Sequence, residues 1–374
     1  MEFFRAARQF LSCLAALSLL APTASFSEDI VFGQSVALSG PASELGREMR
    51  LGAQAYFDIV NAAGGVKGRK IMLRTIDDGY EADRAIANTR RLIADGDVLA
   101  LFGYVGTPTS LPSIAIATEA KVPFFGAFTG AQGLREPFNR YVFNVRASYF
   151  DETELIVKQL AAEGLTKIAV FYQNDSYGQA GLAGVNRALS ARNMKVVGTG
   201  TVERNTVDVA KAVDAMLAVK PEAIVMISAY TSCAEFIKQA KARGLLVRFA
   251  NVSFVGTRAL AKALGNNASG VMISQVMPSP WSERYQWVVE YQKAMKSRNE
   301  QLSYTSLEGF FAARIAVDAL RRGGDASREA FMRALESMRD ANYNGFRIAF
   351  SPSDHNASNF VELTVLDRAG NVRY

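Results

Sequence analysis

Residues 98–129 constrain the fold more than any other stretch of this chain, because two short apolar runs flank one helix-forming segment. The first run, Val98 to Phe102, is short enough for a buried parallel strand, and a second run occupies residues 122–125. Between them, Thr107 stands at an expected helix N-cap and Pro108 at the first helical position, where proline's missing N–H is not needed. The stretch therefore predicts a β-α-β unit of a parallel sheet.

The same alternation continues along the chain. A first series ends near residue 145, and a second begins with the helix expected over residues 151–163. Parallel strands joined by helices need right-handed crossovers, and 374 residues are too many for one typical core. We therefore expect an α/β fold with two doubly wound parallel-sheet lobes. The expected strands lie at residues 30–37, 70–76, 98–102, 122–125, 141–145, 167–172, 195–198, 223–227, 249–251 and 272–277, and near 346–350 and 360–367.

The first 27 residues differ in kind from the rest. Arg5 and Arg8 precede an apolar run from Phe10 to Ala21, and small residues follow as far as Ser27. This order is typical of a secretory signal peptide, and the apolar run is shorter than the about 20 residues of a membrane helix. The sequence thus predicts export, with cleavage near Ser27.

Composition and charge narrow the classes of function. Hydrophobic residues make up 49% of the chain and charged residues 21%, which is typical of a folded globular protein. The net charge of +6 is spread along the sequence without a dense basic block, so no nucleic-acid partner is expected. With Cys13 in the signal segment, Cys233 is expected as a single buried apolar side chain without a disulfide.

Sequence patterns of catalytic and cofactor sites are weak or missing. The single histidine, His355, has no cysteine or acidic partner at metal-ligand spacing. The chain has no G-x-S-x-G elbow and no phosphate-binding loop, and residues 198–200 lack the third glycine of a dinucleotide fingerprint. We therefore expect no catalytic residue, cofactor or metal, and a protein that binds a ligand without transforming it.

Two strand ends of the expected first sheet carry hydroxyl side chains close to a helix N-terminus. Thr107 follows the strand at 98–102, and Thr129 follows the strand at 122–125. Free N–H groups and the helix dipole make this edge attractive to an anion such as a carboxylate. A helix cap alone would also explain Thr107, so both interpretations stay open at this point.

Aromatic residues gather near the same expected strand ends. Binding pockets are mostly apolar and aromatic, so we expect about half of this group to line a cleft and the rest to belong to the core. The group consists of Tyr104, Phe128, Tyr149, Phe150, Tyr230 and Phe254.

Several short motifs, in order along the chain, carry a resemblance to a known family. They are Ala37-Leu38-Ser39-Gly40-Pro41, Asn61 to Gly68, Asp77-Asp78, Gly103 to Thr107, Val122 to Thr129, and the trio of Arg146, Asp151 and Tyr177-Gly178. Together they resemble the leucine/isoleucine/valine-binding protein family, the type I periplasmic solute-binding proteins of ABC transporters. The resemblance covers nearly the whole mature chain.

This resemblance implies two lobes joined by a three-segment hinge. The implied crossings lie near Val145-Arg146, Gln275 to Pro280 and Gly345 to Ser351. The implied parts are a signal peptide at 1–27, a first lobe at 28–145 plus 278–347, and a second lobe at 146–277 plus 348–374. The resemblance further implies a periplasmic monomer that passes a small-molecule solute to an inner-membrane ABC permease with a cytoplasmic ATPase.

The resemblance also implies the ligand contacts of the first lobe. Thr107 and Thr129 would bind a ligand carboxylate through their hydroxyl and backbone N–H groups. Ala127 would offer its carbonyl oxygen, and Leu45 would provide an apolar contact. The first lobe would therefore hold the ligand, and the second would close on it.

In the second lobe, Tyr177 and Tyr230, or its neighbour Ala229, would cover the ligand. Relatives that bind branched-chain amino acids carry an acidic residue for the ligand ammonium, and the aligned position here is Ser253. An ammonium buried without such an acid costs several kcal/mol, on the order of the desolvation of one ion. We therefore expect an organic acid that lacks an α-ammonium, with its ring or chain against Phe150 and the two tyrosines.

Two alternatives remain open in the sequence. Asp151 or Asp175 would replace the missing acid if the ligand is an ordinary amino acid. A clamp of this kind would act as a sensor if it reported its ligand to a membrane receptor or sensor kinase. The sequence does not decide between transport and sensing.

Overall fold

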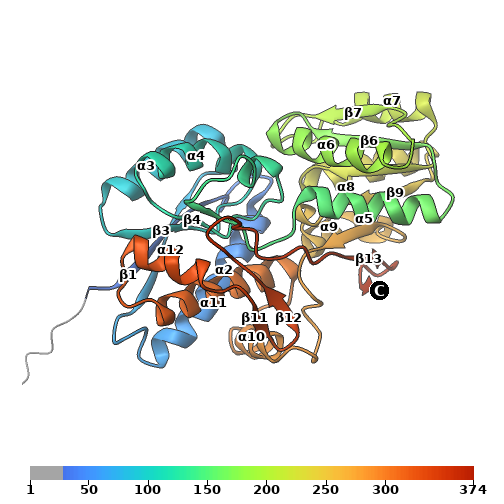
Figure 1. The fold of residues 1–374 in the computed structure, drawn as a ribbon. Helices are drawn as coiled ribbons and strands as arrows, with labels where there is room; N and C mark the ends of the chain where they lie inside the picture. Colours follow the sequence, from blue (N-terminus) through green and yellow to red (C-terminus); the bar gives the residue numbers. More distant parts are fainter. Residues whose placement is uncertain (1–27) are drawn as a thin grey trace, which may run out of the picture.

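The computed structural model describes residues 28–374 as two lobes that lie side by side (Figure 1). Residues 1–27, with the predicted signal peptide and its cleavage near Ser27, lie outside the described residues. Across residues 28–374, no helix has both the length and the apolar character that a membrane crossing requires. The two-lobed α/β fold expected from the sequence is confirmed.

The first lobe is built on a five-stranded parallel sheet with the order β2-β1-β3-β4-β5. Its strands are β1 (Ile30–Val36), β2 (Ile71–Asp77), β3 (Val98–Phe102), β4 (Phe124–Phe125) and β5 (Val142–Phe143). Its connecting helices are α2 (Ser43–Ala62), α3 (Ala82–Ala94), α4 (Thr107–Glu119) and the short η1 (Gln132–Leu134). Every residue of β1 and β3 is buried, as expected for central parallel strands that are covered on both faces.

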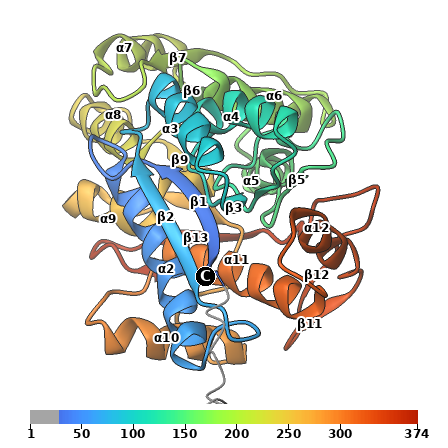
Figure 2. The ribbon, with the colours of Figure 1, turned by 90° about the vertical axis from the view of Figure 1, so that its left-hand side faces the viewer.

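Three helices from the last third of the chain complete the first lobe. They are α10 (Gln286–Ser297), α11 (Tyr304–Arg322) and α12 (Arg328–Glu336), and they lie beside α2 and the first sheet (Figures 1 and 2). Glycines let α11 pack closely on α2. A Cβ at Gly52 would overlap the carbonyl oxygen of Ser306, and one at Gly309 would overlap that of Met49. Segments far apart in the sequence are thereby held backbone to backbone.

The second lobe contains a seven-stranded sheet with the order β14-β13-β10-β9-β8-β6-β7. Its strands are β6 (Ile168–Gln173), β7 (Thr199–Val202), β8 (Ala223–Ile227), β9 (Arg248–Asn251), β10 (Met272–Gln275), β13 (Glu362–Leu366) and β14 (Val372–Arg373). Its helices are α5 (Tyr149–Ala162), α6 (Ser176–Ser190), α7 (Ala210–Val219), α8 (Tyr230–Ala242), α9 (Thr257–Leu264), η2 (Ser253–Val255) and η3 (Gly265–Asn267). The expectation of an all-parallel sheet is wrong here, because β13 and β14 pair antiparallel. β13 reaches the sheet edge from the other lobe, without the crossover helix that parallel pairing needs.

One strand differs from its predicted place, and two strands were not predicted. β7 begins at Thr199, after the predicted strand at 195–198, because its ladder with β6 runs only from the Val170–Thr199 pair to the Gln173–Val202 pair. β12 (Phe346–Ile348) pairs with β11 (Ala341–Tyr343), a strand that we did not predict. The connecting Asn344 and Gly345 both have positive φ, and Asn-Gly is a strong hairpin signal that the periodicity analysis overlooked.

The chain passes between the lobes after β5, after β10 and after β12 (Figure 1). The loop after β4 lies beside the start of α5, which belongs to the other lobe, because the Tyr149 N–H donates to the Gly130 carbonyl at 2.7 Å. Ligands of open α/β sheets bind at the carboxyl ends of the strands. The fold therefore directs attention to the residues between the two lobes.

Candidate functional site

Thr107 lies just after β3, at the start of α4. The prediction that Thr107 is the N-cap is wrong by one residue, because the N-cap is Gly106, with a φ of 97°. A Cβ at Gly106 would collide with the Tyr80 ring, so this turn requires glycine. No side-chain capping bond occurs at this helix start. Capping therefore does not explain the Thr107 hydroxyl.

Thr107, Thr129 and Tyr149 form a buried chain of hydroxyl groups, which we call the hydroxyl trio. The Oγ1 atoms of Thr107 and Thr129 are 2.7 Å apart, and Thr129 Oγ1 lies 3.2 Å from the hydroxyl oxygen of Tyr149. The two threonines follow neighbouring strands of the first lobe, as predicted, whereas Tyr149 is the first residue of α5 in the second lobe. The hydroxyl trio thus joins the two lobes.

An aromatic cluster lies against the hydroxyl trio and consists of Tyr80, Phe128, Tyr149, Tyr177 and Phe254. The Phe254 ring centroid lies 4.5 Å from that of Tyr177, 5.4 Å from that of Phe128 and 6.0 Å from that of Tyr80. The rings of Tyr177 and Tyr149 are 5.5 Å apart. Within residues 28–374, the buried Tyr177 hydroxyl has no hydrogen-bond partner. The apolar rings of the aromatic cluster, together with the unpartnered Tyr177 hydroxyl, suit a small amphipathic ligand.

The two acids that we considered as ammonium partners are occupied elsewhere. Asp175 is the N-cap of α6, and its Oδ1 accepts the backbone N–H of Tyr177 at 2.9 Å. Asp151 belongs to a capping box at the start of α5, where its Oδ2 accepts the backbone N–H and the hydroxyl of Ser148 at 2.9 Å and 2.6 Å. Both carboxylates therefore satisfy helix N-termini.

Arg146 is fully buried at the first crossing between the lobes. Its guanidinium carbon lies 4.7 Å above the Phe128 ring, and Nη2 donates to the Ser253 hydroxyl. Ion pairs of 3.4 Å and 3.7 Å join it to Glu152 of the second lobe and Glu308 of the first. Within the described chain, its Nε and Nη1 have no hydrogen-bond acceptor. Sequence reasoning did not assign Arg146 to the ligand site, although it directly follows an expected strand.

The carboxylates around Arg146 differ in their surroundings. Glu152 Oε2 accepts the backbone N–H of Ser253 at 2.7 Å and the hydroxyl of Ser274 at 2.6 Å. Burial raises the pKa of Glu308 to about 7, although Arg146 opposes this shift. Burial, followed by the nearby Arg146 charge, lowers the pKa of Arg135 to about 10. We call Arg135, Arg146, Glu152 and Glu308 the charge cluster.

A search of protein-family models matches residues 29–371 to the family described as periplasmic binding protein. This chain belongs to that family. The resemblance to the leucine/isoleucine/valine-binding proteins is confirmed as well. Members of this family bind solutes and are exported to the periplasm.

Individual relatives support the same assignment. Leu/Ile/Val-binding protein homolog 7 of Brucella suis is 27% identical over 243 residues, which span 63% of this chain and 61% of that protein. A possible leucine/isoleucine/valine-binding protein from Rhodopirellula baltica is 37% identical, with a TM-score of 0.89 over 93% of this chain and 96% of the other. A substrate-binding periplasmic protein from Ralstonia solanacearum is 31% identical, with a TM-score of 0.87 over 92% and 99%. The curated Brucella relative is thus matched over about three fifths of its length.

The structure places Tyr104 and Phe150 outside the site of this periplasmic binding protein, so these two predictions are corrected. The Tyr104 hydroxyl lies 2.9 Å from Thr89 Oγ1 in the core of the first lobe. Arg187 of α6 lies 5.0 Å above the Phe150 ring. Successive helix residues point about 100° apart, so Phe150 turns away while its neighbour Tyr149 enters the aromatic cluster. Sequence alone does not show which of the two faces the other lobe.

Leu45 and Tyr230 lie along the contact between the lobes, and Ala127 lies in the loop after β4. A Cβ at Gly256 of the second lobe would collide with the Leu45 side chain of the first. Tyr230 lies close to the first turn of α2, and burial raises the pKa of its hydroxyl. The Ala127 carbonyl accepts the Thr129 N–H at 2.9 Å, so both predicted ligand groups bond to each other in this conformation.

Polar residues also join the lobes at the edge of their contact. Arg204 Nη2 lies 2.9 Å from Glu81 Oε2, and Asn205 Nδ2 donates to Glu81 Oε1 at 2.7 Å and to the Gly79 carbonyl at 3.0 Å. We call these the rim contacts. On the other side, Arg258 pairs with Glu48 of α2. The lobes are therefore closed on each other in this structure.

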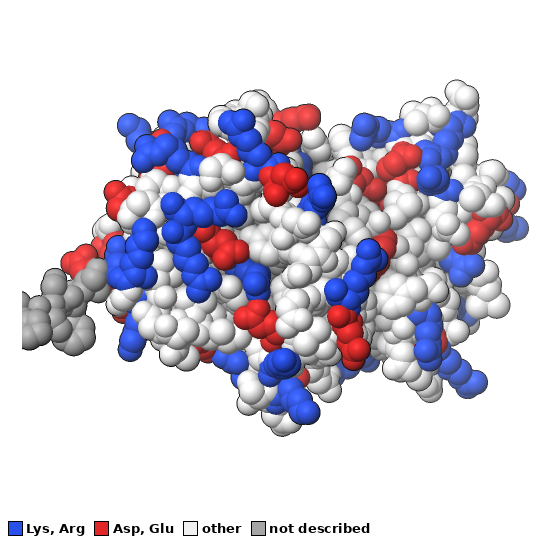
Figure 3. All heavy atoms as spheres, turned by 60° about the horizontal axis from the view of Figure 1, so that its bottom comes forward, with Lys and Arg blue, Asp and Glu red and all other residues white. Residues whose placement is uncertain are grey.

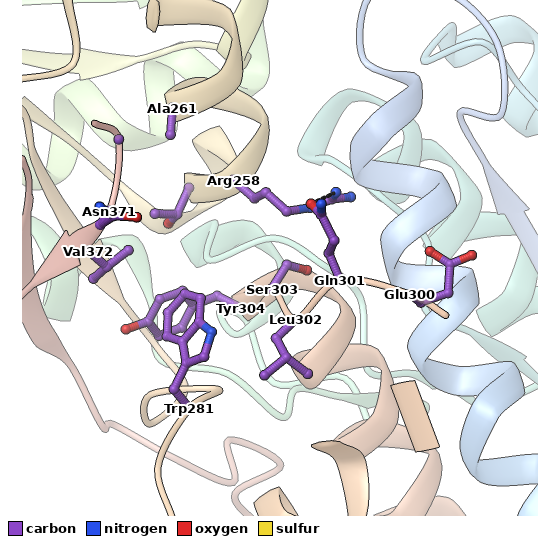
Figure 4. A pocket seen from close by; sticks show the side chains of 12 residues that line it. Arg258, Ala261, Trp281, Glu300, Gln301, Leu302, Ser303, Tyr304, Asn371 and Val372 are labelled. Atoms are coloured by element: carbon purple, nitrogen blue, oxygen red, sulfur yellow. Dashed lines mark hydrogen bonds between the residues drawn. The ribbon is translucent and has the colours of Figure 1, made fainter. Parts of the chain in front are cut away.

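A separate cavity of about 560 Å³ lies between α9, the loop before α11 and β14 (Figure 4). Trp281 and Tyr304 stand together in this cavity with ring centroids 6.0 Å apart, and Arg258 Nη1 donates to Gln301 at 3.0 Å. None of the residues predicted to bind the ligand lines it. This cavity also lies between the lobes, but the hydroxyl trio and the aromatic cluster do not line it.

The remaining residues singled out in the sequence are structural. Cys233 is buried and free, as predicted, and burial raises the pKa of its thiol. His355 stacks on Phe143 with ring centroids 3.7 Å apart, and its Nδ1 lies 3.0 Å from the Val142 carbonyl.

On the face in Figure 3, acidic side chains lie among basic ones over both lobes.

Proposed function

We propose that this protein is the substrate-binding protein of an ABC importer and captures a small carboxylate-bearing solute between its lobes. The observation that carries this proposal is the hydroxyl trio, which lies buried at the carboxyl ends of β3 and β4 and includes a residue of each lobe. The proposed ligand contacts are Thr107, Thr129, Ala127, Leu45, Phe128, Tyr177, Tyr230 and Ser253.

In this proposal the lobes open about the three crossings, and the rim contacts separate. A ligand carboxylate then replaces the bond between the Thr107 and Thr129 hydroxyls. Hydrogen bonds to a charged group contribute about 1.5–3 kcal/mol each, more than the neutral hydroxyl pair that is lost. The ligand touches both lobes and therefore stabilises the closed form.

The proposed hinge sets the lobe boundaries at 145/146, 277/278 and 347/348. Small-angle scattering of the mature protein should give a smaller radius of gyration when ligand is saturating. An unchanged radius of gyration despite proven binding would contradict the proposed closure of the lobes on the ligand. Mass spectrometry of protein from the cell envelope should find an N-terminus close to Glu28, and intact Met1 in the cytoplasm would contradict export.

The function itself is tested on refolded, ligand-free protein. A thermal-shift screen of carboxylic acids and amino acids should yield at least one compound that raises Tm in proportion to its concentration, because ligands that bind only the folded state stabilise it. Calorimetry should then give one site per chain. If no carboxylate binds while an uncharged compound does, the proposed carboxylate site is wrong.

A further inference from the structure

We propose that Arg146 is a specificity-determining residue, which receives an oxygen acceptor of the ligand and thereby selects organic acids that carry no ammonium group. This inference rests on the proposed function, since it concerns the same site. Its substrate class is an acid with a second oxygen function, such as a 2-oxo acid. The geometry of the unpaired donors carries the argument.

Three buried donors near the aromatic cluster have no hydrogen-bond acceptor in residues 28–374, namely Arg146 Nε, the Tyr177 hydroxyl and Arg146 Nη1, which lies 3.7 Å from Glu308 Oε1. Buried donors without partners are rare in folded proteins, because each costs about 1–3 kcal/mol. Arg146 and Tyr177 both pack on the aromatic cluster, through Phe128 and Phe254. A ligand oxygen between the aromatic rings would satisfy such donors, whereas an ammonium would add more donors.

Ser253 strengthens this preference. Its hydroxyl accepts from Arg146 Nη2, and its backbone N–H donates to Glu152, so the residue holds the guanidinium beside the ligand site. A guanidinium repels an ammonium at short range in a buried site, where the dielectric screening is weak. The positive charge of Arg146 therefore lies beside Ser253, at the place where the amino group of a ligand would need a negative charge.

Glu152 and Glu308 are the groups of the charge cluster that could favour an ammonium, and Glu152 is already bound by Ser253 and Ser274. Glu308 faces Arg146, Glu152 and Arg135, and no hydrogen bond from another described residue reaches its carboxylate. With all four groups ionised, the charge cluster is neutral, so an added anion favours the protonated form of Glu308. An added ammonium would favour its ionised form. The direction of proton exchange on binding therefore reports which ligand charge is present.

The test compares matched pairs: 4-methyl-2-oxopentanoate with leucine, and phenylpyruvate with phenylalanine. Calorimetry near pH 7, in two buffers with different ionisation enthalpies, should show tighter binding of one oxo acid than of its amino acid, together with proton uptake. Binding of the amino acids with proton release would overturn the inference and leave the proposed function intact. Failure of every carboxylate to bind would overturn both.

Two variants assign the effect to named groups. Tyr177→Phe removes only a hydroxyl and should weaken oxo-acid binding by about tenfold, in line with one hydrogen bond to a charged ligand. Arg146→Gln should weaken it by more than tenfold and reduce the preference over the amino acid. The controls are Tyr172→Phe and Arg187→Gln, which lie outside the aromatic cluster and should leave affinity unchanged.

Arg146 also ties elements of both lobes together, so its variant needs a readout beyond affinity. A loss of binding without any change in the ratio of oxo-acid to amino-acid affinity would show that Arg146 is structural and would overturn the inference. If Arg146→Gln does not fold, the Tyr177→Phe variant provides the test. If this variant keeps both the oxo-acid affinity and the preference over the amino acid, the proposed site for a ligand oxygen is wrong.

Discussion

The charge cluster and the rim contacts both join the two lobes, but they differ in their exposure to water. Arg146 and Glu152 have no exposed side-chain surface, whereas the side chains of Arg204 and Glu81 are 24% and 44% exposed. Charges at the rim interact through water and salt, so each exposed pair contributes only about 0–1 kcal/mol. Charges in the interior have no such screening. In the proposed function, the interior therefore recognises the ligand, and the rim contacts only favour closure.

The largest expected effect concerns the stability of the buried pair. Glu152→Ala leaves Arg146, the Ser253 N–H and the Ser274 hydroxyl without their carboxylate, and removal of one partner of a buried pair costs about 3–5 kcal/mol. The free energy of unfolding, from denaturant titration, measures this loss. The control on the same helix is Glu154→Ala, which breaks an exposed pair with Arg192 and should cost at most about 1 kcal/mol. Equal losses would erase the contrast between interior and surface.

A second effect is a pH dependence of stability in the interior. Because the folded-state pKa of Glu308 is about 7 and its ordinary value is 4.5, the stability contributed by the protonated group is present below pH 4.5 and is lost as the pH rises through about 7. The loss amounts to at most about 3 kcal/mol, at 1.36 kcal/mol per pKa unit. Unfolding of Glu308→Gln, measured from pH 5 to 8, should lack this component. An identical slope in wild type and variant would refute the assignment to Glu308.

The third effect tests the hydroxyl trio as the anion-binding part of the interior. Thr107→Val and Thr129→Val each remove a hydroxyl and keep the shape, so each should weaken ligand binding by about tenfold or more, in line with about 1.5–3 kcal/mol for a charged hydrogen bond. Calorimetry with the ligand from the thermal-shift screen measures the change. Thr201→Val, at an exposed position of the edge strand β7, is the control. Wild-type affinity in both trio variants would place the carboxylate elsewhere.

The smallest effect is expected at the rim. Arg204→Ala removes an exposed pair to Glu81, so affinity should fall by a factor of about two to five, corresponding to at most about 1 kcal/mol. The deficit should shrink at high salt, because exposed charges are then screened. Titrations at low and high ionic strength provide the measurement. A tenfold loss of affinity that persists at high salt would show that the rim contacts contribute as much to binding as the buried groups do.

Local patterns predicted most of the fold and part of the site. The apolar runs located β1, β3, β6 and β8, because buried parallel strands are short, continuous and apolar. The threonines after two neighbouring strands were found for the same reason, since parallel strand ends share one edge of the sheet. The sequence analysis missed β11, β14 and the short helix α9, and it misplaced β7. β11 depends on a tight hairpin turn and β7 lies at a sheet edge, where apolar periodicity is a weak guide.

The sequence by itself determined the alternation of strands and helices, the hydroxyl groups at the edge of the first sheet and the absence of an acid at Ser253. Only the tertiary structure decided that Tyr149, not Phe150, meets Thr129, and that Arg146 lies between Glu152 and Glu308. The physical reason is the range of the forces involved. Periodicity and turn preferences act among neighbouring residues, whereas a buried charge finds its partners only when α5, η2 and α11 come together across the closed lobes.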